Sequence, residues 1–192
     1  TIYGYVGILN LDVGGAAAVN DVSTPVTNPP SDYGGGYGID ISSGIKENGN
    51  TRISYGSGIT SGDKVMCAFD VDAGKIWWGK NGTWFASGNP ATAANPAYTG
   101  QDFGSACPFV TTQDGSTSII NFGQDSSFAG TDTTTAGPYT DGGGIGDFFY
   151  EPPTGFLALC TQNLPEPTVV PSEHFNTVTY TGTGSYPRSF NS

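Results

Sequence analysis

The sequence predicts an all-β protein: an antiparallel β-sandwich with long loops and almost no helix. Three observations carry this prediction. Short segments alternate apolar and polar residues at the two-residue period of a strand. Clusters of Gly, Pro, Asn and Asp separate these segments, as they do at turns. A helical period of apolar residues is almost absent. The chain has 192 residues, which is enough for one sizeable core.

The central stretch, Gly62 to Gly82, predicts two strands and the turns that fix their pairing. Lys64 to Val71 alternates, and Lys75 to Gly79 returns antiparallel to it. Asp72-Ala73-Gly74 suits the connecting turn, because Asp bonds its own backbone and Gly accepts a positive φ. Asn81-Gly82 is the dipeptide typical of a type I′ turn.

The alternation in this hairpin also predicts which side chains are buried. Ile76 and Trp78 share one face of their strand and Trp77 lies on the other, so we expect Trp77 to point outward. Cys67 is expected to be a small buried hydrophobe. The residues expected in the core together are Val65, Cys67, Phe69, Ile76 and Trp78.

The rest of the chain yields further strands and loops by the same reasoning. Strands are predicted at Thr1–Asn10, Ile39–Ile41, Thr51–Tyr55, Cys107–Thr112, Ser116–Phe122 and Phe148–Leu159. Of these, Cys107–Thr112 and Ser116–Phe122 would form a hairpin around Gln113-Asp114-Gly115. Loops or turns are predicted at 12–30, 31–38, 46–50 and 83–103.

The domain organisation predicted from composition has three parts. Residues 1–164 form the sandwich, in which the Gly, Thr, Ser and Asp content of 124–147 indicates an inserted surface excursion. Residues 165–174 form a stiff linker rich in proline. Residues 175–192 begin a following β module. The chain is therefore expected to be a segment of a longer protein.

Several motifs of the chain agree with one known family. The hairpin contains Asp70-Val71-Asp72, then Gly74 to Trp78, then Asn81-Gly82. The other agreeing segments follow in the family's order: Tyr5–Ile8, Tyr33–Tyr37, Cys107–Val110, Ile120–Gln124 and Pro152–Phe156. Together these segments resemble the SPRY domain, a B30.2-related, concanavalin-like jelly roll, over roughly residues 3 to 165.

Two further segments, Gly79–Trp84 and Ala158–Pro165, resemble SPRY-like modules in structural proteins of marine tailed phages. The resemblance implies a virion or extracellular protein whose loops contact a host glycan, a host protein or neighbouring virion subunits. It also implies a larger homo-oligomeric assembly. The family's first strands would precede Thr1, so one sheet edge is expected to be open unless other chain supplies them.

Composition disfavours several classes of partner. The net charge is −11, and the six Lys and Arg residues are scattered, so nucleic acid and anionic membranes are disfavoured. Apolar runs fall short of a membrane span, and membrane insertion is not expected. The three cysteines, Cys67, Cys107 and Cys160, are widely spaced, and a bridge between Cys67 and Cys107 stays open.

Enzymatic chemistry finds little support in the sequence, and no cofactor or metal is expected. The sole histidine, His174, lies at the end of the predicted linker, away from any partner for a triad or a zinc site. Asp70 and Asp72 share a strand face at a spacing near that of an inverting glycosidase, although Asp72 also suits the turn. A carbohydrate-active enzyme on a concanavalin-like sandwich therefore remains an alternative, as does an intracellular peptide-binding SPRY adaptor.

The candidate binding residues are aromatic. Tyr33, Tyr37 and Trp84 lie in turn-rich segments, as do Tyr98 and Tyr139, where no core demands a ring. Aromatic faces beside Asn, Asp and Thr can stack on sugars while polar groups bond hydroxyls. The alternative is that each ring packs under its own loop. We expect Tyr33, Tyr37 and Trp84 to mark the surface that binds a partner.

Overall fold

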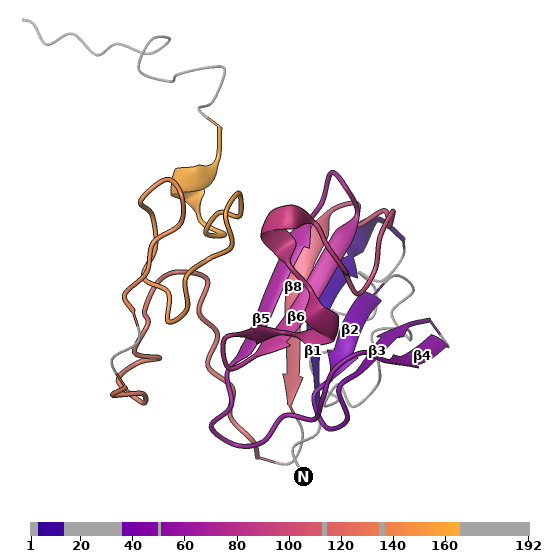
Figure 1. The fold of residues 1–192 in the computed structure, drawn as a ribbon, viewed down its shortest axis with the longest axis horizontal. Coiled ribbons are helices and arrows are strands. Elements are labelled where there is room, and N and C mark those ends of the chain that lie inside the picture. The colour runs from indigo at the N-terminus through magenta and orange to yellow at the C-terminus, as the bar shows by residue number, and fades with distance from the viewer. Residues whose placement is uncertain (1–3, 14–35, 50, 113–114, 135–136, 166–192) are drawn as a thin grey trace, which may run out of the picture.

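The computed structural model describes residues 4–13, 36–49, 51–112, 115–134 and 137–165. It confirms the predicted all-β class (Figure 1): the strands of this part of the chain form two antiparallel sheets. Helical residues there occur only as short 3-10 turns. None of the described helices is long and apolar enough to cross a membrane.

The larger sheet has five strands in the order β4-β3-β2-β1-β8. Its strands are β1 (Gly4–Asn10), β2 (Gly36–Asp40), β3 (Ile45–Asn48), β4 (Thr51–Ser54) and β8 (Ala106–Thr112). β1 is central, with Ile8 opposite Tyr37 of β2 and Pro108 of β8. Residues distant in sequence are thereby brought onto one surface.

The smaller sheet has three strands in the order β5-β6-β7. They are β5 (Val65–Asp70), β6 (Lys75–Lys80) and β7 (Thr83–Trp84). The two predicted turns lie between them. Gly74 has φ 61°, and Asn81 and Gly82 have φ 51° and 82°. Two successive positive φ values are the requirement of the type I′ turn predicted there.

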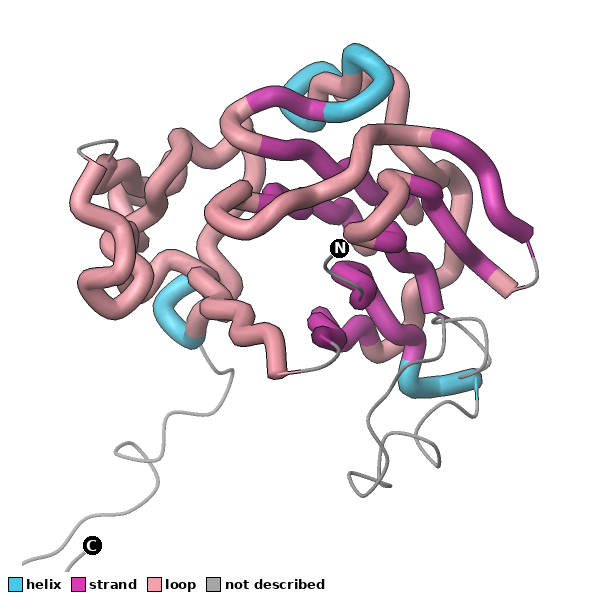
Figure 2. Tube along the Cα trace, turned by 90° about the horizontal axis from the view of Figure 1, so that it is seen from below, coloured by secondary structure: helices cyan, strands magenta, loops and turns pink. Residues whose placement is uncertain are grey.

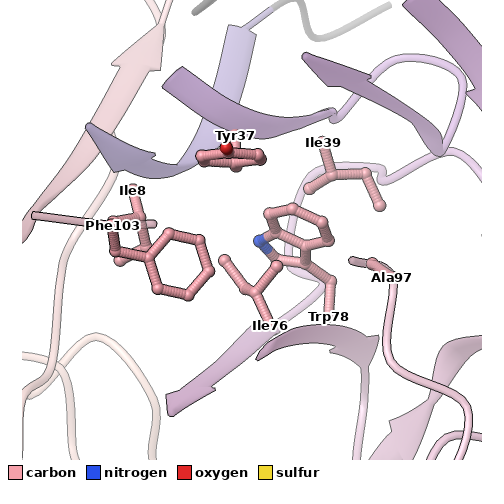
Figure 3. Packing of buried hydrophobic residues seen from close by; sticks show 7 residues of the cluster. All are labelled: Ile8, Tyr37, Ile39, Ile76, Trp78, Ala97 and Phe103. Carbon is pink, nitrogen blue, oxygen red and sulfur yellow. The ribbon is translucent and has the colours of Figure 1, made fainter. Parts of the chain in front are cut away.

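The core lies between the two sheets (Figure 3). Ile8, Tyr37 and Ile39 point from the larger sheet toward Ile76 and Trp78 of the smaller one. The irregular segment after β7 completes the cluster with two further side chains, Ala97 and Phe103. Ile39, Ile76 and Trp78 are each 0% exposed, so the predicted inward face of β6 is correct.

Two burial predictions for the hairpin are wrong, and two hold only in part, because Phe69 is half-buried against the core cluster and Val65 is half-buried outside it. Trp77 is fully buried although it lies on the opposite face of β6, because the segment around Ala94 and the ring of Phe156 cover it. Cys67 is exposed although its cross-strand neighbour Trp78 is buried. β5 forms one edge of the smaller sheet. The protein around Cys67 nevertheless desolvates its thiol and raises the pKa of Cys67 to about 12.

Other element predictions need correction too. Residues 36–38, 46–48 and 83–84, expected in loops or turns, belong to β2, β3 and β7. The predicted strands Ser116–Phe122 and Phe148–Leu159 are not strands; within them only Phe148 makes a β-bridge, to Tyr139. The three cysteines are free, so the Cys67–Cys107 bridge is absent. The expected loop at 12–30, apart from its first two residues, and the 175–192 module lie outside the described residues.

Residues 116–134 and 137–165, here called the C-terminal lobe, lie beside the sheets and consist of loops and turns (Figure 2). Lys64 joins the lobe to β5: it forms an ion pair with Asp132 and lies 4.2 Å from the centroid of the Phe149 ring. Phe156 packs edge-on against Trp77, with ring centroids 5.9 Å apart. The expectation that 124–147 is an inserted excursion stays a prediction.

Candidate functional site

Trp84 is the predicted site residue whose surroundings best suit a binding role. It ends β7, directly after the Asn81-Gly82 turn, and lies opposite Gly79 of β6. Its side chain is half-buried. Among the described residues, its indole N–H has no hydrogen-bond acceptor and its ring contacts no other ring. One flat apolar surface and one polar donor are therefore available to a partner.

The segment that follows is held in an unusual backbone conformation. Seven described residues other than glycine have a positive φ, and four of them lie between Ala86 and Asn95. Ala86 and Ser87 are consecutive, with φ 53° and 55°. Each such residue costs on the order of 1 kcal/mol or more, and conformations of this kind cluster at functional sites. We call Thr83–Asn95 the aromatic loop.

A hydrogen bond from buried Trp77 and further hydrogen bonds within the segment fix the aromatic loop. Trp77 donates its indole N–H to the carbonyl oxygen of Ala94 at 2.8 Å. Asn89 and Ala94 exchange both backbone hydrogen bonds at 3.0 Å, which closes a small internal turn. Asn95 donates its side-chain amide to the carbonyl of Ser87 at 3.1 Å. The loop is thus fixed before any partner arrives, which lowers the ordering cost of binding.

Phe85 anchors the beginning of the aromatic loop on the larger sheet's side of the core. Its ring packs edge-on against Tyr55, with centroids 6.2 Å apart. Gly56 is required there, because a Cβ on it would lie 2.5 Å from the Phe85 ring. Trp84 and Phe85 therefore divide two roles between them: Phe85 packs inward, and Trp84 remains half-exposed.

A lysine fixes the chain where it leaves the aromatic loop. Lys46 donates to the carbonyl of Ala97, and its Nζ lies 4.7 Å from the centroid of the Tyr98 ring. Partial burial lowers the pKa of Lys46. Burial also raises the pKa of Tyr98 to about 12, so its hydroxyl stays protonated near neutral pH. Tyr98 is thus a packing residue of the core and not an exposed loop aromatic.

The polar character of the aromatic loop points to a neutral ligand. From Thr83 to Gln101 the sequence contains no Asp, Glu, Lys, Arg or His, although the chain carries a net charge of −11. The exposed side chains of the loop that can hydrogen-bond are Thr83, Ser87, Asn89, Thr92 and Asn95. Amides and hydroxyls around an aromatic ring can bond sugar hydroxyls or peptide groups without a charge pair.

The other two predicted site residues are Tyr37 and Tyr33, and the structure describes only Tyr37. Tyr37 lies in β2, where it is 9% exposed and donates its hydroxyl to Gln101 at 3.0 Å. Its predicted position in an open loop is therefore wrong, and its burial favours a packing role. Tyr33 lies outside the described residues. Tyr139, in the C-terminal lobe, is 41% exposed and far along the chain from the aromatic loop.

The acidic pair considered for catalysis has a structural explanation. Asp70 accepts a hydrogen bond from the N–H of Ala73 at 2.9 Å, so Asp70 stabilises the β5–β6 turn. The sequence had suggested Asp72 for this position; Asp72 is exposed in the same turn. No group of three or more His, Cys, Asp or Glu suited to a metal ion occurs among the described residues.

The best-connected charges lie on the larger sheet. Arg52 of β4 pairs with Asp40 of β2 at 3.0 Å and with Glu47 of β3. Burial alone would raise the pKa of Asp40, but hydrogen bonds from Ser42, Ser43 and Arg52 outweigh it and lower that pKa. This network ties three strands together, and its carboxylates are already paired.

Comparisons with protein families, with curated proteins and with solved structures find no match to this chain.

Proposed function

We propose that this chain is a non-enzymatic recognition module, in which the sheets hold the aromatic loop in place for a neutral partner. The observation that carries the proposal is Trp84: a half-exposed indole with no partner, beside a strained but tightly bonded loop. Loops positioned by a rigid scaffold are where binding residues concentrate. Exposed Trp residues also commonly dominate binding energy.

The partner we propose is a glycan of a host cell surface, with a neighbouring virion protein as the other source of similar groups. Support comes from the absence of charge between Thr83 and Gln101, because stacking and hydrogen bonds to hydroxyls need none. The sequence resemblance to SPRY-like modules of tailed phages supports a place in a virion. No observation on Asp70 or Asp72 favours the enzyme alternative.

Substitution of Trp84 tests this function. We expect Trp84→Ala to weaken binding to purified bacterial polysaccharides and to whole bacterial cells by about 2 kcal/mol or more, roughly 30-fold. Trp84→Phe should retain much of the affinity, because it keeps a flat ring. Thermal melts should remain close to wild type, since Trp84 is not part of the buried core. Binding isotherms and whole-cell pull-downs provide the measurement.

The matched control is Tyr139→Ala, which removes an exposed ring from the C-terminal lobe. It should leave binding unchanged. Equal affinity of wild type and Trp84→Ala would place the binding surface elsewhere. Turnover of the same polysaccharides by the wild-type chain would instead favour the enzyme alternative.

A further inference from the structure

The C-terminal lobe reaches the face of the smaller sheet that carries Trp84. Trp84 lies opposite Gly79, which follows the inward-facing Trp78 in β6. Successive strand residues alternate between faces and directly opposed residues share one, so Gly79 and Trp84 both lie on the outer face. Trp77 lies on the same face, and Phe156 of the lobe packs against it. The lobe and the aromatic loop therefore border one surface.

A second residue of the lobe, Tyr150, lies over the turn that leads into Trp84. A Cβ on Gly82 would lie 3.2 Å from Cε1 and 3.5 Å from Cδ1 of the Tyr150 ring. Gly82 precedes Trp84 by two residues, which span at most about 7 Å. Tyr150 and Trp84 are therefore neighbours, although the structure gives no ring contact between them in the described part of the chain.

The lobe fixes the ring of Tyr150 and leaves its hydroxyl available. The ring packs edge-on against Phe149, with centroids 4.8 Å apart, and Phe149 is 6% exposed. Tyr150 itself is half-buried. Its hydroxyl is accessible and has no hydrogen-bond partner among the described residues. Like Trp84, Tyr150 thus offers a partner an apolar ring and one unused polar group.

The turn between the two rings has a fixed shape. The N–H of Asn81 donates to the carbonyl of Lys64 at 2.9 Å, and its side-chain oxygen accepts from the N–H of Lys64 at 2.8 Å. Its side-chain amide donates to Asp63 at 2.7 Å. The charges at this turn are paired as well, Lys64 with Asp132 and Lys80 with Asp63. The turn therefore offers a charged ligand none of its described charges unpaired.

We propose that Trp84 and Tyr150 are two stacking positions of one binding surface, which takes a neutral glycan chain of several sugars instead of a single terminal sugar. This inference rests on the proposed function, because it gives the glycan a second contact. Two rings held apart by a fixed turn can stack on two sugars of one chain, while the indole N–H and the phenol bond their hydroxyls. The second contact forms within the same complex, so affinity should rise with chain length.

Glycan fragments of defined length test the proposal. The probe is a bacterial polysaccharide that the wild type binds, partially hydrolysed and separated by length. For the wild type we expect affinity to rise from the shortest fragment that binds to the longer ones. Tyr150→Ala should lose this rise and bind long fragments at least about tenfold more weakly than wild type, yet bind the shortest fragment equally. Trp84→Ala should weaken binding at every length.

The outcomes separate this inference from the function on which it rests. If Tyr150→Ala binds long fragments as well as wild type, or weakens binding equally at every length, Tyr150 is not a second stacking position, while the proposed function stands. If Trp84→Ala binds as well as wild type, or wild type binds no polysaccharide, both fail.

The exposed carboxylate of Glu151, next to Tyr150 in the chain, tests the charge of the ligand. A neutral glycan has no charge to attract or repel, so Glu151→Gln should leave the affinity for long fragments unchanged. A change of about tenfold or more, in either direction, would contradict a neutral ligand at this surface.

Chemical labelling of the unaltered chain gives a readout that a purely structural role of Tyr150 would not change. Tetranitromethane nitrates accessible tyrosine rings, and Tyr150 and the 41% exposed Tyr139 should both react in the free protein. Saturation with the polysaccharide should abolish nitration of Tyr150 and leave that of Tyr139 unchanged, as measured by mass spectrometry of the peptides. Equal nitration of Tyr150 with and without the polysaccharide would overturn the proposal.

Discussion

Replacing Trp78 with alanine should lower the free energy of unfolding by about 3–5 kcal/mol, the range for truncating a buried aromatic side chain. Trp78 is 0% exposed and its ring packs edge-on against Tyr55 and Tyr98. Removing it opens a cavity at the point where the two sheets meet. Chemical denaturation of the wild type and the variant, analysed for a two-state transition, provides the measurement.

Trp77→Ala should cost a similar amount, although sequence alternation places Trp77 on the outer face. It too is 0% exposed, and its indole N–H bonds the carbonyl of Ala94, which the substitution would leave without this donor. Trp84→Ala is the matched control, because it removes the same side chain from a half-buried position. Two destabilised variants and one near-neutral one are expected. A near-neutral Trp77→Ala would contradict the covered outer face described here.

The difference between Trp78 and Trp77 shows which parts of the fold could be predicted from the sequence. Alternation and turn residues act locally, so the hairpin, its turns and the inward face of β6 could be predicted. The cover over Trp77 comes from Ala94 and Phe156, which are distant along the chain and lie in segments without periodicity. Such a cover leaves no local signal in the strand that it buries.

The glycines beside Tyr37 led to the wrong prediction that Tyr37 lies in a loop. Its glycine neighbours suggested a loop, but in the structure glycine allows two strands to approach closely. Gly38 lies opposite Gly7, and a Cβ on Gly7 would lie only 2.0 Å from the carbonyl oxygen of Tyr37. A glycine that a strand needs for close packing and one that a turn needs look alike in a single sequence.

The candidate site was predictable only in part. The turn-rich segment after Asn81-Gly82 predicted an accessible Trp84, and its half-buried position agrees, but Trp84 ends a strand and does not lie in the predicted loop. The left-handed conformation at four positions from Ala86 to Asn95 had no such signal, because alanine and serine do not favour a positive φ. It depends on hydrogen bonds to Trp77 and within the loop, which only the folded chain provides.

The C-terminal lobe contains a second feature that the composition of 124–147 did not predict. Asp141 is 5% exposed, and four donors converge on its carboxylate. Oδ1 accepts from the N–H groups of Gly143 and Ile145 at 2.9 and 3.0 Å. Oδ2 accepts from the N–H of Ala158 and the side-chain amide of Asn163, both at 2.9 Å. One carboxylate thus fastens residues that lie more than twenty positions apart.

Substituting Asp141 should therefore release the C-terminal lobe while the sheets stay folded. In Asp141→Ala all four donors lose their acceptor, and in Asp141→Asn the new amide group opposes donors at one of the two positions. Both variants should be cleaved within the lobe at protease concentrations that leave wild type intact. Asp72→Asn, at an exposed carboxylate in the β5–β6 turn, is the control and should behave as wild type.

The same carboxylate predicts how the lobe responds to acid. Hydrogen bonds, first from Ala158 and then from Ile145, lower the pKa of Asp141 from its ordinary 3.8 to about 2. A carboxyl whose pKa is lower in the folded state stabilises that state above its unfolded pKa and loses the contribution as pH falls through the folded one. The lobe should thus loosen between about pH 4 and pH 2, the interval that those two pKa values define. Amide exchange at Ala158 and Ile145 follows this directly, and protection at these amides that is equal in Asp141→Asn and wild type at pH 6 would contradict the role assigned to Asp141.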